Sequence, residues 1–169
     1  MITIYEGTPS ASKGRFAIVV ARFNQSITGR MLDGAVQTLM AHGIPDEQID
    51  VAWVPGAFEI PTVAARLASD GRHVAILCLG AVIRGQTTHD QHINRAVSIA
   101  LAQLGTQYKM PLIFGILTCE TLEQAIARSG GCVSTTGKDD VQAHLGNKGV
   151  DCAEAALEMV NLLNKLPGL

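Results

Sequence analysis

The residues best suited to chemistry lie in one stretch, Leu79 to His92, where a long apolar run gives way to polar residues. The turn inside this stretch carries a glutamine and two threonines, and helical spacing follows it at once. Backbone N–H groups at the start of a helix, with hydroxyl groups beside them, form an anion site. His89 stands at the rim of the turn, and a histidine can move protons near neutral pH. The stretch therefore predicts a phosphate-binding turn with an acid–base group beside it.

Two other apolar runs, residues 15–21 and 49–54, also end in turns of unusual content. Phe23 follows the first run, and Phe58 and Glu59 follow the second. Each phenylalanine could pack in the core, although a core residue is less expected in a polar turn, and Phe23 could instead stack on a planar heterocycle. Glu59 could be a first-turn acid favoured by the helix dipole, or it could bind ligand hydroxyls. Spacing alone leaves both choices open.

Four residues are candidate ligands for metals or anions. His89, Asp90 and His92 stand at helical spacing, but two histidines and one acid without a further ligand cluster are a weak metal signal. We therefore predict no metal site. Arg128 falls in the last turn of a predicted helix, where a cation offsets the helix dipole. Spacing alone gives Arg128 no other role.

The elements that must position these residues alternate between strands and helices. Apolar runs predict strands at 15–21, 49–54, 74–83 and 112–117, and helical spacing predicts helices at 31–40, 61–70, 90–104, 121–128 and 150–166. Residues 2–5 alternate between apolar and polar, which predicts a short N-terminal edge strand. Alternating strands and helices favour an α/β three-layer sandwich, in which a parallel four-stranded sheet is flanked by helices. The carboxyl ends of parallel strands meet at one edge, so the polar turns should lie together.

Composition limits the class of protein. The 169 residues predict one domain, 1–169, with a long irregular connection at about 130–149. A formal net charge of −2 without a basic block argues against a nucleic-acid partner. No apolar run approaches the roughly 20 residues of a membrane span, and the N-terminus lacks the pattern of a signal peptide. The four cysteines form no C-x-x-C pair, so we expect a cytoplasmic protein with reduced thiols.

Six motifs cover nearly the whole chain: Arg22-Phe23-Asn24, Val54-Pro55-Gly56-Ala57-Phe58-Glu59-Ile60-Pro61, Gly80-Ala81-Val82-Ile83-Arg84-Gly85-x-Thr87-x-His89, Phe114-Gly115-Ile116-Leu117-Thr118, Glu123-Gln124-Ala125-Ile126-x-Arg128 and Gly146-Asn147-Lys148-Gly149. In this order they resemble the motifs of the 6,7-dimethyl-8-ribityllumazine synthase family. Each motif is weak alone, but together they are highly specific. The resemblance implies a flavodoxin-like fold and a transferase of riboflavin biosynthesis that condenses a ribitylamino-uracil with 3,4-dihydroxy-2-butanone 4-phosphate. Phosphate and water would be released, and no metal or redox cofactor would be needed.

The resemblance also implies a set of site residues. His89 would be the catalytic proton shuttle. The substrate-binding residues would be Phe23, Ala57, Phe58, Glu59, Ala81, Val82, Ile83, Gln86, Thr87, Phe114 and Arg128. Within this set, Phe23 would stack on the pyrimidine and Glu59 would accept ribityl hydroxyls. Gln86, Thr87 and Arg128 would hold the phosphate, and Phe114 and Arg128 would come from a neighbouring subunit.

The family resemblance implies a homo-oligomer built from pentamers. The connection between Arg128 and Asn147 is longer than the family's usual spacing. In shell-forming members this connection lies where pentamers approach each other, so we predict a pentamer or a pair of pentamers in preference to an icosahedral shell. Two alternatives remain open at this stage, a non-catalytic flavodoxin-like protein that binds flavin or lumazine, and a shell-forming structural protein.

Overall fold

The central layer of the protein is a sheet of four parallel strands in the order β2-β1-β3-β4. The computed structural model describes residues 1–132 and 146–168. The strands are β1 (Arg15–Ala21), β2 (Ile49–Val54), β3 (His73–Ile83) and β4 (Leu112–Cys119). The predicted four-stranded parallel sheet is therefore confirmed. The strand order reverses between β1 and β3, and ligand crevices form at the carboxyl ends of strands at such a reversal.

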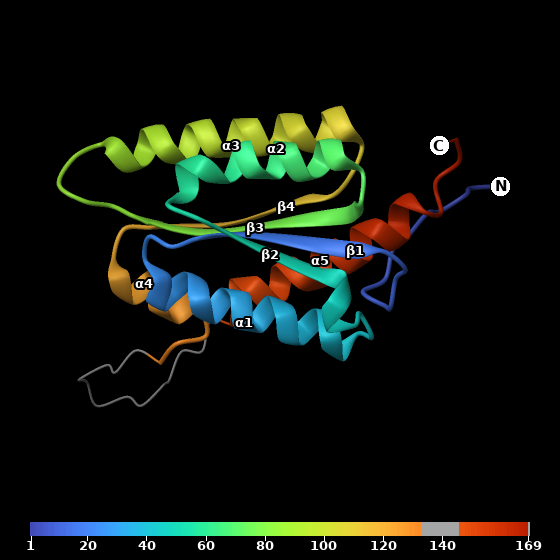
Figure 1. The fold of residues 1–169 in the computed structure, drawn as a ribbon, viewed down its shortest axis with the longest axis horizontal. Coiled ribbons are helices and arrows are strands. Elements are labelled where there is room, and N and C mark those ends of the chain that lie inside the picture. Colours follow the sequence, from blue (N-terminus) through green and yellow to red (C-terminus); the bar gives the residue numbers. More distant parts are fainter. Residues whose placement is uncertain (133–145, 169) are drawn as a thin grey trace.

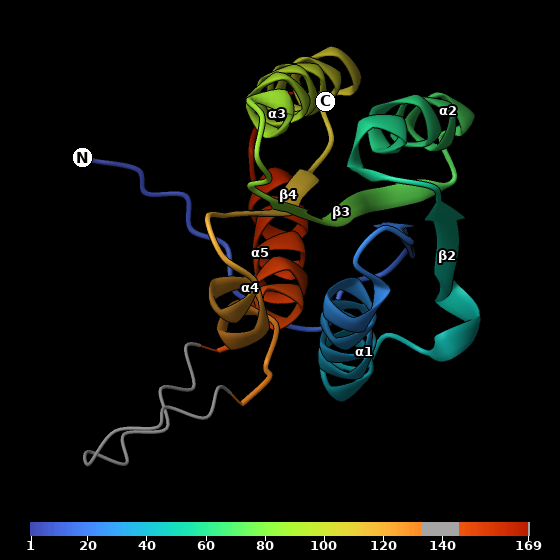
Figure 2. The ribbon, with the colours of Figure 1, turned by 90° about the vertical axis from the view of Figure 1, so that its left-hand side faces the viewer.

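Helices cover both faces of the sheet, which confirms the predicted three-layer sandwich (Figure 1 and Figure 2). One face carries α2 (Ile60–Asp70) and α3 (His89–Tyr108), and the other carries α1 (Gln25–Ala41), α4 (Leu122–Arg128) and α5 (Lys148–Leu163). Two single-turn 3₁₀ helices, η1 (Asp46–Gln48) and η2 (Ala57–Glu59), precede β2 and α2. In Figure 1 the carboxyl ends of the strands lie on the left, at the edge opposite the two chain termini.

The side chains of β1 and β3 contribute to two hydrophobic cores, one on each face of the sheet. Successive side chains of a strand point to opposite faces, so a strand covered on both sides needs a continuous apolar run. The residues of these two strands in the cluster that includes α1 and α5 are Phe16, Ile18, Val20, Ala75, Leu77, Leu79 and Ala81. The residues of these strands in the cluster that includes α2 and α3 are Ala17, Val19, Ala21, Ile76, Cys78 and Val82. The sheet is thereby fixed from both sides, and its carboxyl edge is a rigid base for the turns.

Helices α1 and α5 cross in close backbone contact. A Cβ atom placed on Gly149 would lie 1.8 Å from the carbonyl oxygen of Met31, so only glycine permits this approach. The side chain of Asn147, the N-cap of α5, accepts a hydrogen bond from Gly149 N at 2.8 Å. The start of α5 is therefore held against α1, close to the end of α4.

Two sequence predictions about chain ends are wrong. Residues 2–5 form no strand, because alternation decides which side chains share a face but a strand also needs a partner backbone. The described residues of this chain offer them none. The following residues instead run along the end of α5, where Asn161 donates to the carbonyl oxygen of Thr8 and Lys165 donates to that of Glu6. The last helix begins at Lys148 and ends at Leu163, short of the predicted Leu166.

Burial dominates the chemistry of two of the four free cysteines. It raises the pKa of the Cys78 thiol well above its usual range and that of Cys152 to about 11. Both thiols therefore behave as small apolar side chains. In the parts of the chain that the structure describes, no helix combines the length and the apolar character needed to cross a membrane.

A charged cluster ties the three strands β1, β2 and β3 together at their amino ends. Arg15 donates two hydrogen bonds to Asp50, at 3.1 and 2.7 Å, and the Nε2 atom of buried His73 lies 2.8 Å from the same carboxylate. The hydrogen bond from Arg15, followed by that from His73, lowers the pKa of Asp50 well below its ordinary value of 3.8. β2 is an edge strand, so this cluster helps to hold it to its neighbours.

We expect the stability that Asp50 contributes to depend on pH. Because its pKa is lower in the folded chain, the contribution is present above the unfolded value and is lost as the pH falls through the folded one. The Asp50→Asn variant should be less stable than the parent at pH 7 by on the order of 1 kcal/mol, since the carboxylate is partly exposed and screened. Urea unfolding should show this difference shrinking steadily below about pH 4. Asp33→Asn, an exposed change on α1, is the control, and an unchanged difference at low pH would contradict the assignment.

Candidate functional site

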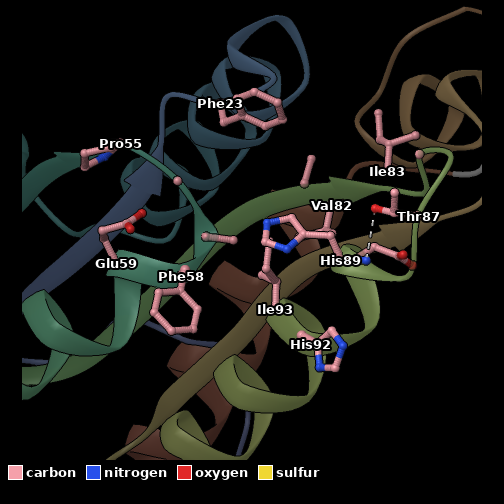
Figure 3. Close-up of a pocket in the computed structure, with 15 residues that line it drawn as sticks. Phe23, Pro55, Phe58, Glu59, Val82, Ile83, Thr87, His89, His92 and Ile93 are labelled. Atoms are coloured by element: carbon pink, nitrogen blue, oxygen red, sulfur yellow. Dashed lines mark hydrogen bonds between the residues drawn. The ribbon is translucent and has the colours of Figure 1, made fainter.

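A cleft opens at the carboxyl edge of the sheet, at the point where the strand order reverses (Figure 3). Its volume is about 710 Å³, within the roughly 300–1,000 Å³ that is usual for small-molecule sites. Its walls come from the turns after β1, β2 and β3 and from the first turn of α3. The three polar turns that were predicted to share one edge therefore do so.

The turn after β1 presents the ring of Phe23 at the mouth of the cleft. The N–H of Phe23 donates to the carbonyl oxygen of Pro55 at 3.0 Å, which ties this turn to the end of β2. The next residue, Asn24, adopts a left-handed conformation (φ 60°), and its Nδ2 donates to the carbonyl oxygen of Ala81 at 2.9 Å. Asparagine tolerates this conformation better than most residues. The backbone of Phe23 is thus held from both sides while its ring stays 71% exposed.

The turn after β2 contributes a buried alanine, an exposed aromatic ring and a carboxylate to the cleft. Ala57 is buried, and a Cβ on Gly80 of β3 would lie 3.4 Å from its methyl group, so the turn packs directly on β3. Phe58 is 59% exposed, and Glu59 is the last residue before α2. A carboxylate oxygen of Glu59 would lie 3.1 Å from a Cβ on Gly56, which places the carboxylate over that glycine.

Exposure decides one of the choices that spacing left open. Neither Phe23 nor Phe58 belongs to the two apolar core clusters, and both rings are mostly exposed beside the cleft. The core-packing interpretation is therefore wrong for both residues. An exposed aromatic face at a cleft is available for stacking.

The end of β3 forms the back of the cleft. Ala81 and Val82 are buried and Ile83 is half-buried, and all three line the cavity. In the turn that follows, Thr87 lines the cleft, whereas Gln86 is exposed and lies outside the cleft wall. The phosphate-binding turn predicted from sequence thus brings Thr87, but not Gln86, to the cavity.

His89 is the first residue of α3 and lines the cleft. Its backbone N–H lies 3.5 Å from the hydroxyl oxygen of Thr87, the dashed line in Figure 3. The figure shows its imidazole directed from α3 toward the turn that carries Phe58 and Glu59, while the ring of His92 points away. The exposed imidazole can therefore exchange protons with a molecule in the cleft and with solvent.

The two histidines are not arranged as a metal site. In Figure 3 their rings point in different directions. Within residues 1–132 and 146–168, no group of three or more His, Cys, Asp or Glu side chains is placed to hold a metal ion. The cleft instead combines an apolar floor with exposed rings, a carboxylate and an imidazole.

A second, more polar cavity lies at the end of β4. Its volume is about 520 Å³, and it is lined by Ile116, Leu117, Thr118, Cys119, Gln124, Arg128, Lys148 and Asp151. Arg128 is the exposed last residue of α4 and Lys148 the first residue of α5. Lys148 Nζ lies 3.9 Å from an Asp151 carboxylate oxygen. Two cations at one cavity are suited to an anion such as phosphate.

One chain does not bring all the predicted site residues together. The cleft contains nine of them: Phe23, Ala57, Phe58, Glu59, Ala81, Val82, Ile83, Thr87 and His89. Arg128 lines the second cavity, which shares no residue with the cleft. Phe114 is 40% exposed on β4, the edge strand. The predicted irregular connection at about 130–149 lies outside the described residues from 133 to 145.

Sequence reasoning missed several residues that line the two cavities. Asp90, His92 and Ile93 extend the cleft along α3, and helical spacing from His89 could have identified them. Lys148 stands in the Gly146-Asn147-Lys148-Gly149 motif, and that motif was the available signal for it. Thr118 likewise stands at the end of the Phe114-Gly115-Ile116-Leu117-Thr118 motif, whereas Asp151 gave no signal, because only the packing of β4 against α5 brings it to this cavity.

A comparison with family models agrees with this architecture. The model of the family described as 6,7-dimethyl-8-ribityllumazine synthase matches residues 13–164 of the 169. The match spans all four strands and all five α-helices, and it includes every lining residue of both cavities. This chain belongs to the 6,7-dimethyl-8-ribityllumazine synthase family.

Proposed function

We propose that this protein condenses 5-amino-6-ribitylamino-uracil with 3,4-dihydroxy-2-butanone 4-phosphate to 6,7-dimethyl-8-ribityllumazine, the penultimate step of riboflavin biosynthesis, in the cytoplasm. Phosphate and water leave. The observation that carries the proposal is the convergence of Phe23, Glu59 and His89 on one cleft from three separate strand ends. Membership of the family supports it.

The pyrimidine would bind in the cleft. Its planar ring would stack on the exposed ring of Phe23 and rest on the apolar floor of Ala81 and Val82. Its ribityl hydroxyls would donate hydrogen bonds to the Glu59 carboxylate, which lies on the far side of the cleft from His89 (Figure 3). Binding of this kind fixes the orientation of the amine before the second substrate arrives, and orientation can supply much of the barrier reduction.

The chemistry then needs proton transfers and a stabilised leaving group. The amine attacks the ketone carbon of the butanone, one water leaves, and an imine forms. Phosphate is then eliminated, and the ribitylamino nitrogen attacks the carbonyl carbon formed by that elimination, which closes the ring with loss of a second water. His89 would move the protons, because its imidazole faces the cleft and solvent. Arg128, together with the amides and Thr87 of the turn, would hold the phosphate and stabilise its departure.

The separation of the two cavities on one chain supports a site shared between subunits. The cleft would meet the Arg128 cavity and Phe114 of a neighbouring copy. β4 is an edge strand, and a largely apolar groove beside its amino end is lined by residues that include Leu112, Ile113, Met159 and Leu166. An unpaired strand edge beside an apolar groove is suited to association with another chain. A neighbouring chain would therefore both cover the edge strand and complete the site.

Activity with both substrates tests the proposal directly. The purified protein should form lumazine, detected by its absorbance, and release one phosphate for each lumazine formed. Each substrate alone should give neither product. Saturable binding of the pyrimidine without phosphate release would instead identify a binding module and would reject the proposed reaction.

We propose a pentamer or a pair of pentamers as the assembly. The connection after Gly130 is longer than is usual in the family and includes Lys138, Asp139 and Asp140, which would be costly to bury unpaired between pentamers. Light scattering should therefore give five or ten times the mass of one chain. A particle with the mass of an icosahedral shell would contradict this. Deleting residues from the connection should leave the pentamer intact.

A further inference from the structure

The C-terminal end of α4 is fixed by a buried hydroxyl group. Ser129 follows Arg128 directly and is completely buried. Its Oγ donates to the carbonyl oxygen of Ile126 at 3.0 Å and accepts from Nε and Nη2 of Arg30 at 3.2 and 3.0 Å. Two donors of one guanidinium therefore meet on a single oxygen atom. Hydrogen bonds from a charged group are stronger than neutral ones, so this contact holds Ser129 firmly to α1.

The local backbone is shaped around this contact. A Cβ on Gly131 would lie 2.6 Å from Cγ2 of Ile126 and 3.3 Å from Nη2 of Arg30, so a larger residue would push against the guanidinium. The N–H groups of Ser129 and Gly131 both donate to the carbonyl oxygen of Ile126, at 3.1 and 2.9 Å. The last turn of α4 thus closes on itself beside Arg30.

The same arginine also holds the start of α5. The carbonyl oxygen of Arg30 accepts from Nδ2 of Asn147 at 2.9 Å, and the Asn147 side chain lies over Gly34, where a Cβ would come within 2.7 Å. The backbones of Ser129 and Asn147 pair in an isolated antiparallel β-bridge. Arg30, Ser129 and Asn147 form one polar cluster, which we call the Arg30 cluster. It joins three helices, α1, α4 and α5.

The Arg30 cluster stands one residue away from each cation of the polar cavity. Arg128 precedes Ser129 in sequence, Lys148 follows Asn147, and both cations line the same cavity. The helix that carries Arg128 is only seven residues long and ends at Arg128, so the contacts of Ser129 act directly on its last turn. Without the cluster, the ends of α4 and α5 would lose the contacts that set the spacing of these two cations.

We propose that Arg30 and Ser129 are positioning residues for anion binding by Arg128: their contact sets where the Arg128 guanidinium stands beside Lys148. This inference rests on the proposed function, in which that anion is the phosphate of the butanone substrate. Ser129 is too deeply buried to touch a substrate, so its effect passes through Arg128. The effect should therefore be selective for the phosphate-bearing substrate.

The kinetic test uses the Ser129→Ala variant of the full chain. Its KM for the butanone phosphate should rise about tenfold, because the guanidinium of Arg128 is displaced but still present. Its KM for the pyrimidine and its kcat at saturation should stay close to those of the parent. A purely structural role would move both KM values and the melting temperature together, and that result would overturn the inference.

Matched variants separate the contact from other effects of substitution. Ser98→Ala removes an exposed hydroxyl with the same bond to a carbonyl three residues back, in α3, and should leave both KM values unchanged. Arg30→Met should reproduce the selective defect of Ser129→Ala. Arg30→Lys retains a charged donor and should restore part of the affinity. If Arg30→Met fails to fold, Ser129→Ala still decides.

A binding measurement decides the inference even if the parent makes no lumazine. Calorimetric titration with inorganic phosphate should show binding to the parent that Arg128→Ala abolishes and Ser129→Ala weakens about tenfold, an energy change typical of one hydrogen bond to a charged group. Equal phosphate affinity in the parent and Ser129→Ala would overturn the positioning role. Absence of lumazine formation alone would reject the proposed reaction and leave this measurement valid.

Discussion

The His89→Ala variant is expected to turn over about 10²- to 10⁴-fold more slowly than the parent, the range typical of a general acid–base group. Proton transfers accompany imine formation, phosphate loss and ring closure, and the imidazole at the cleft is placed to serve them. Substrate affinity should change little, because stacking and the carboxylate remain. Steady-state kinetics with both substrates gives kcat and the two KM values, which separate these effects.

The matched comparison is His92→Ala. His92 lies one helical turn along α3 and lines the same cleft, but its ring points away from that of His89 (Figure 3). Its loss should lower kcat only a few-fold. Nearly full turnover in His89→Ala would show that His89 is merely an exposed first-turn residue. A larger loss in His92→Ala than in His89→Ala would transfer the acid–base role to the second histidine.

The layered fold could be predicted because its signals are local. The apolar runs of β1 and β3 are continuous, which occurs where both faces of a strand are covered, and the helical faces between the strands supply those covers. The helix predicted at 121–128 is α4, and the hydroxyl oxygen of its N-cap, Thr121, accepts from Gln124 N at 3.3 Å. These features depend on neighbours within a few positions along the chain.

The N-terminal segment could not be predicted in the same way. Residues 2–5 have the alternation of a strand, but strand formation depends on a partner backbone, and none lies beside them within residues 1–132 and 146–168. The end of α5 also differs from the prediction. Leu166 continues the apolar spacing of the helix, yet the helix ends at Leu163, because Pro167 lacks an N–H and cannot extend it.

The position of the cleft at the strand ends could be predicted from the sequence. The hydrogen bonds between distant parts of the chain could not. Parallel topology alone places the turns after β1, β2 and β3 at one edge. The bond from Asn24 to Ala81 and the contact of Arg30 with Ser129 join residues 57 and 99 positions apart. No local sequence pattern predicts such contacts, since they form only when the helices pack against the sheet and each other.

Arg128 is the residue whose location most limits what one chain can do. It was expected to hold the phosphate together with Gln86 and Thr87 of a neighbouring subunit, and it lines a cavity that shares no residue with the cleft of its own chain. The cleft and this cavity are therefore separate on a single chain. Residues supplied by a second copy reconcile the expected roles with this geometry, because ring-shaped oligomers place different surfaces of adjacent subunits against each other.

We expect Arg128→Ala to raise the KM for the butanone phosphate roughly 10- to 100-fold, as follows from losing about 1.5–3 kcal/mol of charged hydrogen bonding. The KM for the pyrimidine should stay close to that of the parent, since its contacts lie in the cleft. Arg66→Ala, which removes an exposed arginine of α2, is the control and should change neither value. Equal losses for both substrates would instead indicate a defect in folding or assembly.

Mixing two variants that have little activity at a low concentration of the butanone phosphate tests whether the cleft and the Arg128 cavity of one site come from different subunits. Phe23→Ala damages the cleft and Arg128→Ala damages the polar cavity, so neither homo-oligomer holds an intact site. After subunit exchange in equal amounts, about a quarter of the interfaces in a ring should pair an intact cleft with an intact polar cavity. Activity should therefore recover toward about a quarter of that of the parent. If the cleft and the Arg128 cavity of one site belonged to one chain, no mixture could contain an intact site. Activity that stays low after exchange is proved by mass spectrometry would then rule out the shared site.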